Sequence, residues 1–334
     1  DAIAIGKRAS ASGDAAVAIG KKADASGSDA LAFGKKAEAS GDQSVALGMK
    51  SNASGQDALA LGAQASAVGT SSTAVGALST ASGTAATAFG WQSSAVGERA
   101  HAIGHLASAT GERSLAIGEA ATAASANSTA IGNMAMADGV DALAIGDNAM
   151  ATGPSTTSIG GESMTEGPGA TAIGWQASAT AERAQAFGHL ASAEGVRSLA
   201  VGEAATAASD NSTAIGNLAM ADGADALAIG DSAMATGPST TSIGGETVTE
   251  GPGATAIGWQ ASATAERAQA LGHLASAEGV RSLAVGEAAT AASDNSTAIG
   301  NLAMADGVDA LAIGDSAMAT GPSTTSIGGE TVTE

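Results

Sequence analysis

The sequence predicts an all-β fold, a parallel β-roll solenoid in which each 14-residue repeat forms one two-stranded coil. A frame of 14 residues runs from Asp1 to Glu334 without insertion or deletion, with 23 complete repeats and 12 residues of another. Position 6 of this frame is always glycine, and position 5 is always Ile, Val, Leu or Phe. Small residues alternate at positions 2 and 4 and again at 9 and 11, which is the period of a β-strand. A short fixed repeat of this kind is typical of solenoids.

Each coil is expected to contain two short strands, one before the glycine at position 6 and one before the usual glycine at position 13. Alanine-rich sequence with a seven-residue half-period is also compatible with a coiled coil. The 47 glycines argue against it, because each costs about 1 kcal/mol in a helix.

Alternation assigns an inside and an outside to each strand. Positions 10 and 12 carry polar residues, so 9 and 11 face inward, and the small residues at 2 and 4 fill the other half of the interior. The large apolar residue at position 5 then faces outward, where a continuous apolar stripe indicates an interface between subunits. The competing assignment places position 5 inside and the alanines outside. The predicted interface residues are Ile5, Ile19, Phe33, Phe89, Ile103, Ile131, Ile173, Phe187 and Ile257.

We expect one elongated solenoid domain over residues 1–334, built of 24 coils. Residues 1–84 form six near-neutral coils with seven basic and seven acidic residues, and 85–168, 169–252 and 253–334 are three copies of an 84-residue acidic block. The last two copies differ only at Phe187/Leu271 and Ala224/Val308. The net charge of −20 lies entirely in 85–334 and disfavours nucleic acid as a partner. The lysines near the start are the only candidate for such binding.

Catalytic, cofactor and metal sites are not predicted. The chain has no cysteine, which excludes disulfides and thiolate ligands. No Ser/His/Asp arrangement, phosphate-binding loop lysine or calcium nonapeptide repeat is present. We therefore expect a protein that is not an enzyme.

Two outward columns are candidate ligand-binding sites. Trp91 and His105 occupy position 7 of adjacent coils, where they would lie about 4.8 Å apart and stack. His105 with Glu119 is a possible metal or ligand pair, although a solvated ladder on the turn is the simpler interpretation. Met136, Met150 and Met164 occupy position 10 of three consecutive coils. Exposed methionine is an adaptable contact surface, and the alternative is packing between neighbouring coils.

The hexapeptide Asn127-Ser128-Thr129-Ala130-Ile131-Gly132 recurs at 211–216 and 295–300. It resembles the NSVAIG-type repeat of the YadA-like head of trimeric autotransporter adhesins, with threonine in place of valine. The resemblance implies a left-handed β-roll, a homotrimer, and a place on the surface of a Gram-negative bacterium. It also implies an outer-membrane anchor C-terminal to this segment, which would provide the only membrane contact. Collagen binding in the family carries over to Asn127, Ser128, Ile131 and Gly132.

The predicted function is that of an adhesin head that binds extracellular matrix, such as collagen, fibronectin or laminin, through many weak repeated contacts. The alternative is a structural spacer that projects another adhesive domain from the cell surface, which the near-identical copies favour. An ice-binding solenoid is disfavoured because threonine at position 3 alternates with isoleucine at position 5.

Overall fold

The computed structural model describes residues 1–334 and consists of short β-strands joined by turns, with no helix. Odd-numbered strands cover positions 3–5 of each repeat, beginning with β1 (Ile3–Ile5), and even-numbered strands cover positions 10–11, beginning with β2 (Ser10–Ala11). This rule gives the bounds of every strand to β47 (Thr325–Ile327) and β48 (Val332–Thr333). The prediction of a parallel solenoid with two strands per coil is confirmed.

The chain forms two compact units, Asp1–Gly169 and Ala170–Glu334. The first contains β1 to β24 and the second β25 to β48. The boundary falls at the start of the 169–252 block, and nothing in the sequence marks it as a break. The continuity of a single solenoid from end to end stays a prediction.

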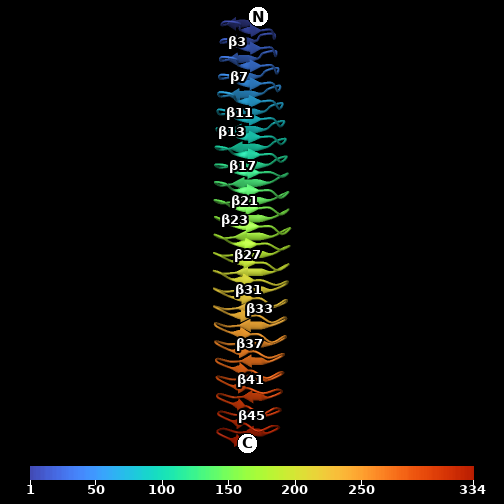
Figure 1. Cartoon of the computed structure of the whole chain (residues 1–334), viewed down its shortest axis with the longest axis vertical. Coiled ribbons are helices and arrows are strands. Elements are labelled where there is room, and N and C mark those ends of the chain that lie inside the picture. The colour runs from blue at the N-terminus through green and yellow to red at the C-terminus, as the bar shows by residue number, and fades with distance from the viewer. The chain divides into compact units, whose positions relative to one another are not determined.

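Within each unit, strands stack in parallel with a fixed offset of 14 residues. β19 (Thr129–Ile131) pairs with β21 (Leu143–Ile145), which places Ile131 opposite Ile145. On the other side of the coil, β20 (Met136–Ala137) pairs with β22 (Met150–Ala151). Figure 1 shows the successive coils stacked in this way. Each frame position therefore becomes a column of side chains about 4.8 Å apart.

The interior of each coil is filled by small side chains at positions 2, 4, 9 and 11. In the coil that spans 141–154 these are Ala142, Ala144, Ala149 and Ala151, all fully buried or within 1% of it. Position 5 lies outside, and Ile5 and Phe89 keep 57% and 54% of their surface exposed. The predicted inside and outside are correct, and the competing assignment is wrong.

One coil in each 84-residue block has a hydroxyl-lined interior. In the coil that spans 155–168, Thr156, Ser158, Ser163 and Thr165 replace the four alanines and are buried. Ser158 Oγ lies 2.8 Å from Ser163 Oγ, and Thr156 donates to the carbonyl of Gly153 at 2.7 Å. Each buried hydroxyl thus has a partner, which such groups require. These coils separate the alanine core into three clusters, the first ending at Ala151.

The turns contain non-glycine residues in the left-handed region. Met134 at position 8 has φ 52° and Asn127 at position 1 has φ 56°. A left-handed third residue matches a type II turn, where glycine is usual. Contacts between coils hold this conformation, because the Met134 amide donates to the carbonyl of Glu119 and the Asn127 amide to that of Glu112, both at 2.8 Å. Neighbouring coils therefore determine the turn geometry.

Glycine at position 6 is required by how closely the coils approach. Gly118 has φ +133°, and its amide donates to the carbonyl of Ile103 at 2.9 Å. A Cβ added to Gly118 would overlap the carbonyl oxygen of Gly132 and lie 2.7 Å from its carbonyl carbon. Both the backbone angle and the close contact exclude a side chain.

The structure has no helix of the length and apolar character needed to cross a membrane. It also has no enclosed pocket. The outward columns carry the side chains of the candidate sites.

Replacing Gly118 by alanine should destabilise the first unit by about 3 kcal/mol or more, because a backbone carbonyl blocks the new methyl group and φ becomes strained. Gly329→Ala is the matched control, since its new Cβ would meet only the Asp315 carbonyl oxygen, at 3.8 Å. Denaturant unfolding followed by circular dichroism measures both. Equal unfolding midpoints for Gly118→Ala and the parent chain would contradict the close-approach argument.

Candidate functional site

The first outward surface is formed by the side chains at positions 3 and 5 of each repeat, on the odd-numbered strands. It is here called the apolar face. Ile103, Ile117 and Ile131 lie opposite one another in successive strands, and Ile145 and Ile159 continue the row. The predicted interface residues all lie on this face. Six are exposed (Ile5, Phe33, Phe89, Ile103, Ile173 and Ile257), and three are half-buried (Ile19, Ile131 and Phe187). Their contact with other subunits stays a prediction.

The second surface is a ladder of side chains at position 7, directly after the glycine at position 6 of each repeat. The rings of Trp91 and His105 have centroids 4.8 Å apart, and His105 Nδ1 lies 3.3 Å from Glu119 Oε1. Asn133 then donates to Asp147 at 2.9 Å. The predicted proximity of Trp91 and His105 is confirmed, although their rings are tilted by 31° and not parallel. Ligand binding by them stays a prediction.

The same ladder recurs in the second unit. Trp175 stacks on His189 with centroids 5.0 Å apart, and His189 lies 3.5 Å from Glu203. No group of three or more His, Asp or Glu side chains is placed to hold a metal ion. The pair of His105 and Glu119 is an exposed contact between neighbouring coils, with 43% and 65% of their side chains accessible.

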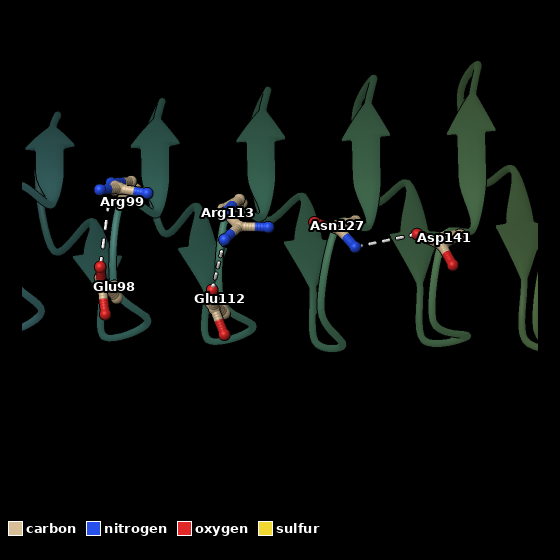
Figure 2. A network of polar contacts seen from close by, with 6 residues as sticks. All are labelled: Glu98, Arg99, Glu112, Arg113, Asn127 and Asp141. Carbon is tan, nitrogen blue, oxygen red and sulfur yellow. Dashed lines mark hydrogen bonds and ion pairs between the residues drawn. The ribbon is translucent and has the colours of Figure 1, made fainter.

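The third surface is a ladder at positions 14 and 1, on the turn at the other end of the coil. Figure 2 shows Glu98 paired with Arg99, Glu112 paired with Arg113, and Asn127 pointing to the next coil. The ion-pair distances are 3.8 and 3.1 Å, and Asn127 Nδ2 donates to Asp141 Oδ1 at 2.9 Å. Both ion pairs are exposed. The contact of Asn127 with Asp141 was missed by the sequence analysis, although their shared position 1 is the signal that could have found it.

The later copies keep part of this ladder. Asn211 donates to Asp225, and Asn295 to Asp309, both at 3.0 Å. Position 14 is Glu112 in the first copy and valine at 196 and 280 in the later copies. The backbone amides of these valines donate to the carboxylates of Asp210 and Asp294. Arg197 and Arg281, which correspond to Arg113, are exposed and form no ion pair. The copies therefore present different surfaces on the same frame.

Comparison with known families decides the classification of this chain. The model described as "YadA head domain repeat (2 copies)" matches nearly all of it. The chain belongs to the YadA head repeat family. The matched residues are 1–23, 25–51, 53–79, 81–107, 109–133, 137–163, 166–191, 193–219, 221–247, 250–275, 277–303 and 305–331.

Among solved structures, this chain is similar to the collagen-binding domain of the Yersinia adhesin YadA. The two chains are 23% identical, and the match covers 56% of this chain and 80% of the other with a TM-score of 0.23. At this TM-score the family assignment rests on the repeat match. A search of curated proteins finds no match.

The four residues of the YadA-type hexapeptide that the motif implied as collagen contacts do not all lie on the surface. Asn127 is exposed, as a ligand contact must be, and Ile131 is half-buried on the apolar face. Ser128 is fully buried and donates to the carbonyl of Ser125 at 2.6 Å. Gly132 serves the close approach of coils, because a Cβ there would overlap Gly146. The motif implied that the Ser128 side chain contacts a ligand. Its burial contradicts this, because position 2 faces the interior of the coil.

The methionine column of the YadA head lies on the outward side of the even-numbered strands. Met136 pairs directly with Met150, and Met150 with Met164 of β24 (Met164–Thr165). Met136 and Met150 are exposed, at 39% and 37%, and Met164 is half-buried. The column therefore offers thioethers to a partner while packing laterally. Binding by it stays a prediction.

Asn127→Val should destabilise the first unit by about 1–2 kcal/mol, because a β-branched residue is strained at φ 56° and the bond to Asp141 is lost. Asn127→Gly relieves the strain but still loses the bond, so it should cost less. Thermal unfolding of the two variants separates these effects. Equal losses would show that the left-handed conformation costs nothing here.

Proposed function

We propose that this chain is the head of a cell-surface adhesin that works by multivalent binding without catalysis. The observation that carries the proposal is that, within each unit, stacked family-type coils with no inserted loop place the same frame positions in outward columns. Such an arrangement repeats the same weak contact many times. Linked contacts raise the effective concentration of each site for its partner.

The apolar face supports assembly into a homotrimer. Large residues such as Ile5, Phe33 and Phe89 are about half exposed in the single chain. Soluble monomers rarely expose a continuous apolar surface of this kind. Copies related by rotation about a common axis would each bury this face against the others. The number three, the left-handed coil and the place on a Gram-negative outer membrane are proposed from the resemblance to the family.

The proposed ligands are proteins of the host extracellular matrix, with collagen first and fibronectin and laminin as further candidates. The exposed methionines at position 10 and Asn127 at the neighbouring turn are the proposed contacts. Methionine adapts to irregular partner surfaces at low steric cost. The acidic charge of residues 85–334 argues against nucleic acid in this region.

A second candidate function is that of a spacer that holds another domain away from the membrane. The supporting observation is the near-identity of 169–252 and 253–334, which adds length without adding a new surface. A spacer needs the apolar face and the solenoid, and does not need the outward methionines.

Light scattering tests the assembly. The parent chain should have three times its chain mass of 31.3 kDa. Changing Ile103, Ile117, Ile131, Ile145 and Ile159 to serine should raise the dissociation constant by at least about a thousandfold, because each buried isoleucine contributes about 1.5–3 kcal/mol. Replacing Met136 and Met150 by serine, on the other side of the coil, is the control and should leave the mass unchanged. A monodisperse monomer at micromolar concentration would overturn the proposed interface.

Solid-phase binding to collagen, fibronectin and laminin tests the ligand. Changing Met136, Met150 and Met164 to serine should weaken binding by a few fold, because two further copies of the column remain. Changing Met220, Met234, Met304 and Met318 as well should weaken it by about tenfold or more. Thr122→Ser, at position 10 of the preceding coil, is the control.

Unchanged binding by the seven-methionine variant, with mass and unfolding midpoint preserved, would contradict a role for this column. Absence of binding by the parent chain to all three proteins would favour the spacer.

A further inference from the structure

All seven basic side chains of residues 1–84 lie on one edge of the first four coils, here called the basic edge. They occupy positions 7 and 8 of the frame, and all are exposed. The residues are Lys7, Arg8, Lys21, Lys22, Lys35, Lys36 and Lys50. The sequence placed these lysines near the start of the chain, and the fold gathers them on a single row of turns.

The turns of the basic edge are held rigidly one above another. The amide of Lys22 donates to the carbonyl of Lys7 at 3.0 Å, and that of Lys36 to Lys21 at 3.0 Å. Lys50 donates to Lys35 at 2.9 Å in the same way. Position 8 is left-handed throughout, with φ of 61° at Lys22 and 62° at Lys36. The cations therefore form two parallel rows with a repeat of about 4.8 Å.

These charges are not neutralised within the chain. None of the seven forms an ion pair. Five of the seven acidic residues of this segment lie at positions 14 and 1, on the turn at the other end of the coil: Asp1, Asp14, Asp29, Asp42 and Asp57. Adjacent like charges repel, so the array is unfavourable for folding unless a partner supplies negative charge.

We propose that the basic edge binds a linear sulfated polysaccharide. A straight, rigid row of cations complements a linear polyanion, and binding releases counterions from the polymer. Single-stranded nucleic acid fits less well, because its binding sites use aromatic side chains to stack bases. The single aromatic residue of 1–84 is Phe33, at position 5 on the apolar face.

Double-stranded DNA also fits poorly. The basic edge is only two columns wide, and Asp24 and Glu38 at position 10 border it. The two phosphate strands of a duplex lie across grooves about 6–12 Å wide, whereas two adjacent frame positions are separated by only about 4 Å, so the edge can contact one strand but not both. A single polysaccharide chain is narrow enough to follow the edge.

This site uses residues other than the methionine column proposed to bind matrix proteins. It rests on the proposed function only in that both require a head exposed to extracellular polymers. Loss of collagen binding and loss of polysaccharide binding can therefore be observed independently of each other.

The test is binding of the full chain to immobilised heparin at increasing salt. The edge variant changes Lys21 and Lys35 to alanine and Lys22 and Lys36 to glutamine, which are the residue types that Ala63 and Gln64 provide at the same positions. We expect at least about tenfold weaker binding and a shallower dependence on salt. The matched control changes Arg99, Arg113, Arg183 and Arg197 to glutamine, the residue at Gln43 in that column, and should bind heparin like the parent chain.

Both variants lower the net charge by four, so a difference between them reports position and not total charge. Desulfated heparin should bind the parent chain weakly. Equal affinity of the edge variant and the parent chain, or equal loss in both variants, would overturn the proposal. Tighter binding of the parent chain to duplex DNA or to single-stranded oligothymidine than to heparin would replace it with a nucleic-acid site.

Discussion

The backbone hydrogen bonds between successive coils are the constraint on which the rest of the molecule depends. Within each unit they join turns as well as strands, as the bonds from Gly118 to Ile103 and from Asn127 to Glu112 illustrate. Coils held at this spacing leave room only for small side chains inside and for glycine at position 6. An inserted residue would remove a coil from this ladder and leave its amides without partners. The chain accordingly keeps its 14-residue frame throughout.

Because the interior admits only small side chains, variation in side-chain size and charge is confined to the outward columns. Arg113 pairs with Glu112, whereas Arg197 follows Val196 in the next copy and has no such partner. The turn is not disturbed, because φ is 54° at Arg113 and 58° at Arg197. Charged side chains, methionines and aromatic rings therefore form separate columns on coils that share one backbone geometry. The family repeat matches most of the chain in this form, and the side chains that vary lie on repeated outward surfaces.

Much of this arrangement could be predicted from the period of the sequence. The buried alanines, the outward position of Ile131 and the contact of Trp91 with His105 all follow from alternation and from the offset of 14 residues. Ser128 was misassigned because the family motif was given more weight than alternation, which places position 2 inside. Left-handed turns at residues such as Met134 could not be predicted, because contacts between coils override the local preference for glycine. The division at Gly169 has no signal in the frame.

The hydroxyl-lined coils bear on how such a head changes length during evolution. In the coil that spans 155–168, Ser158 and Ser163 satisfy each other, and the threonine hydroxyls bond to backbone carbonyls that every coil possesses. The same pairing recurs between Ser242 and Thr247 in the next block. The four buried hydroxyls of such a coil therefore find all their partners within their own block. They keep these partners when a whole block is duplicated or deleted, so recombination can lengthen or shorten the protein while selection on its surface continues.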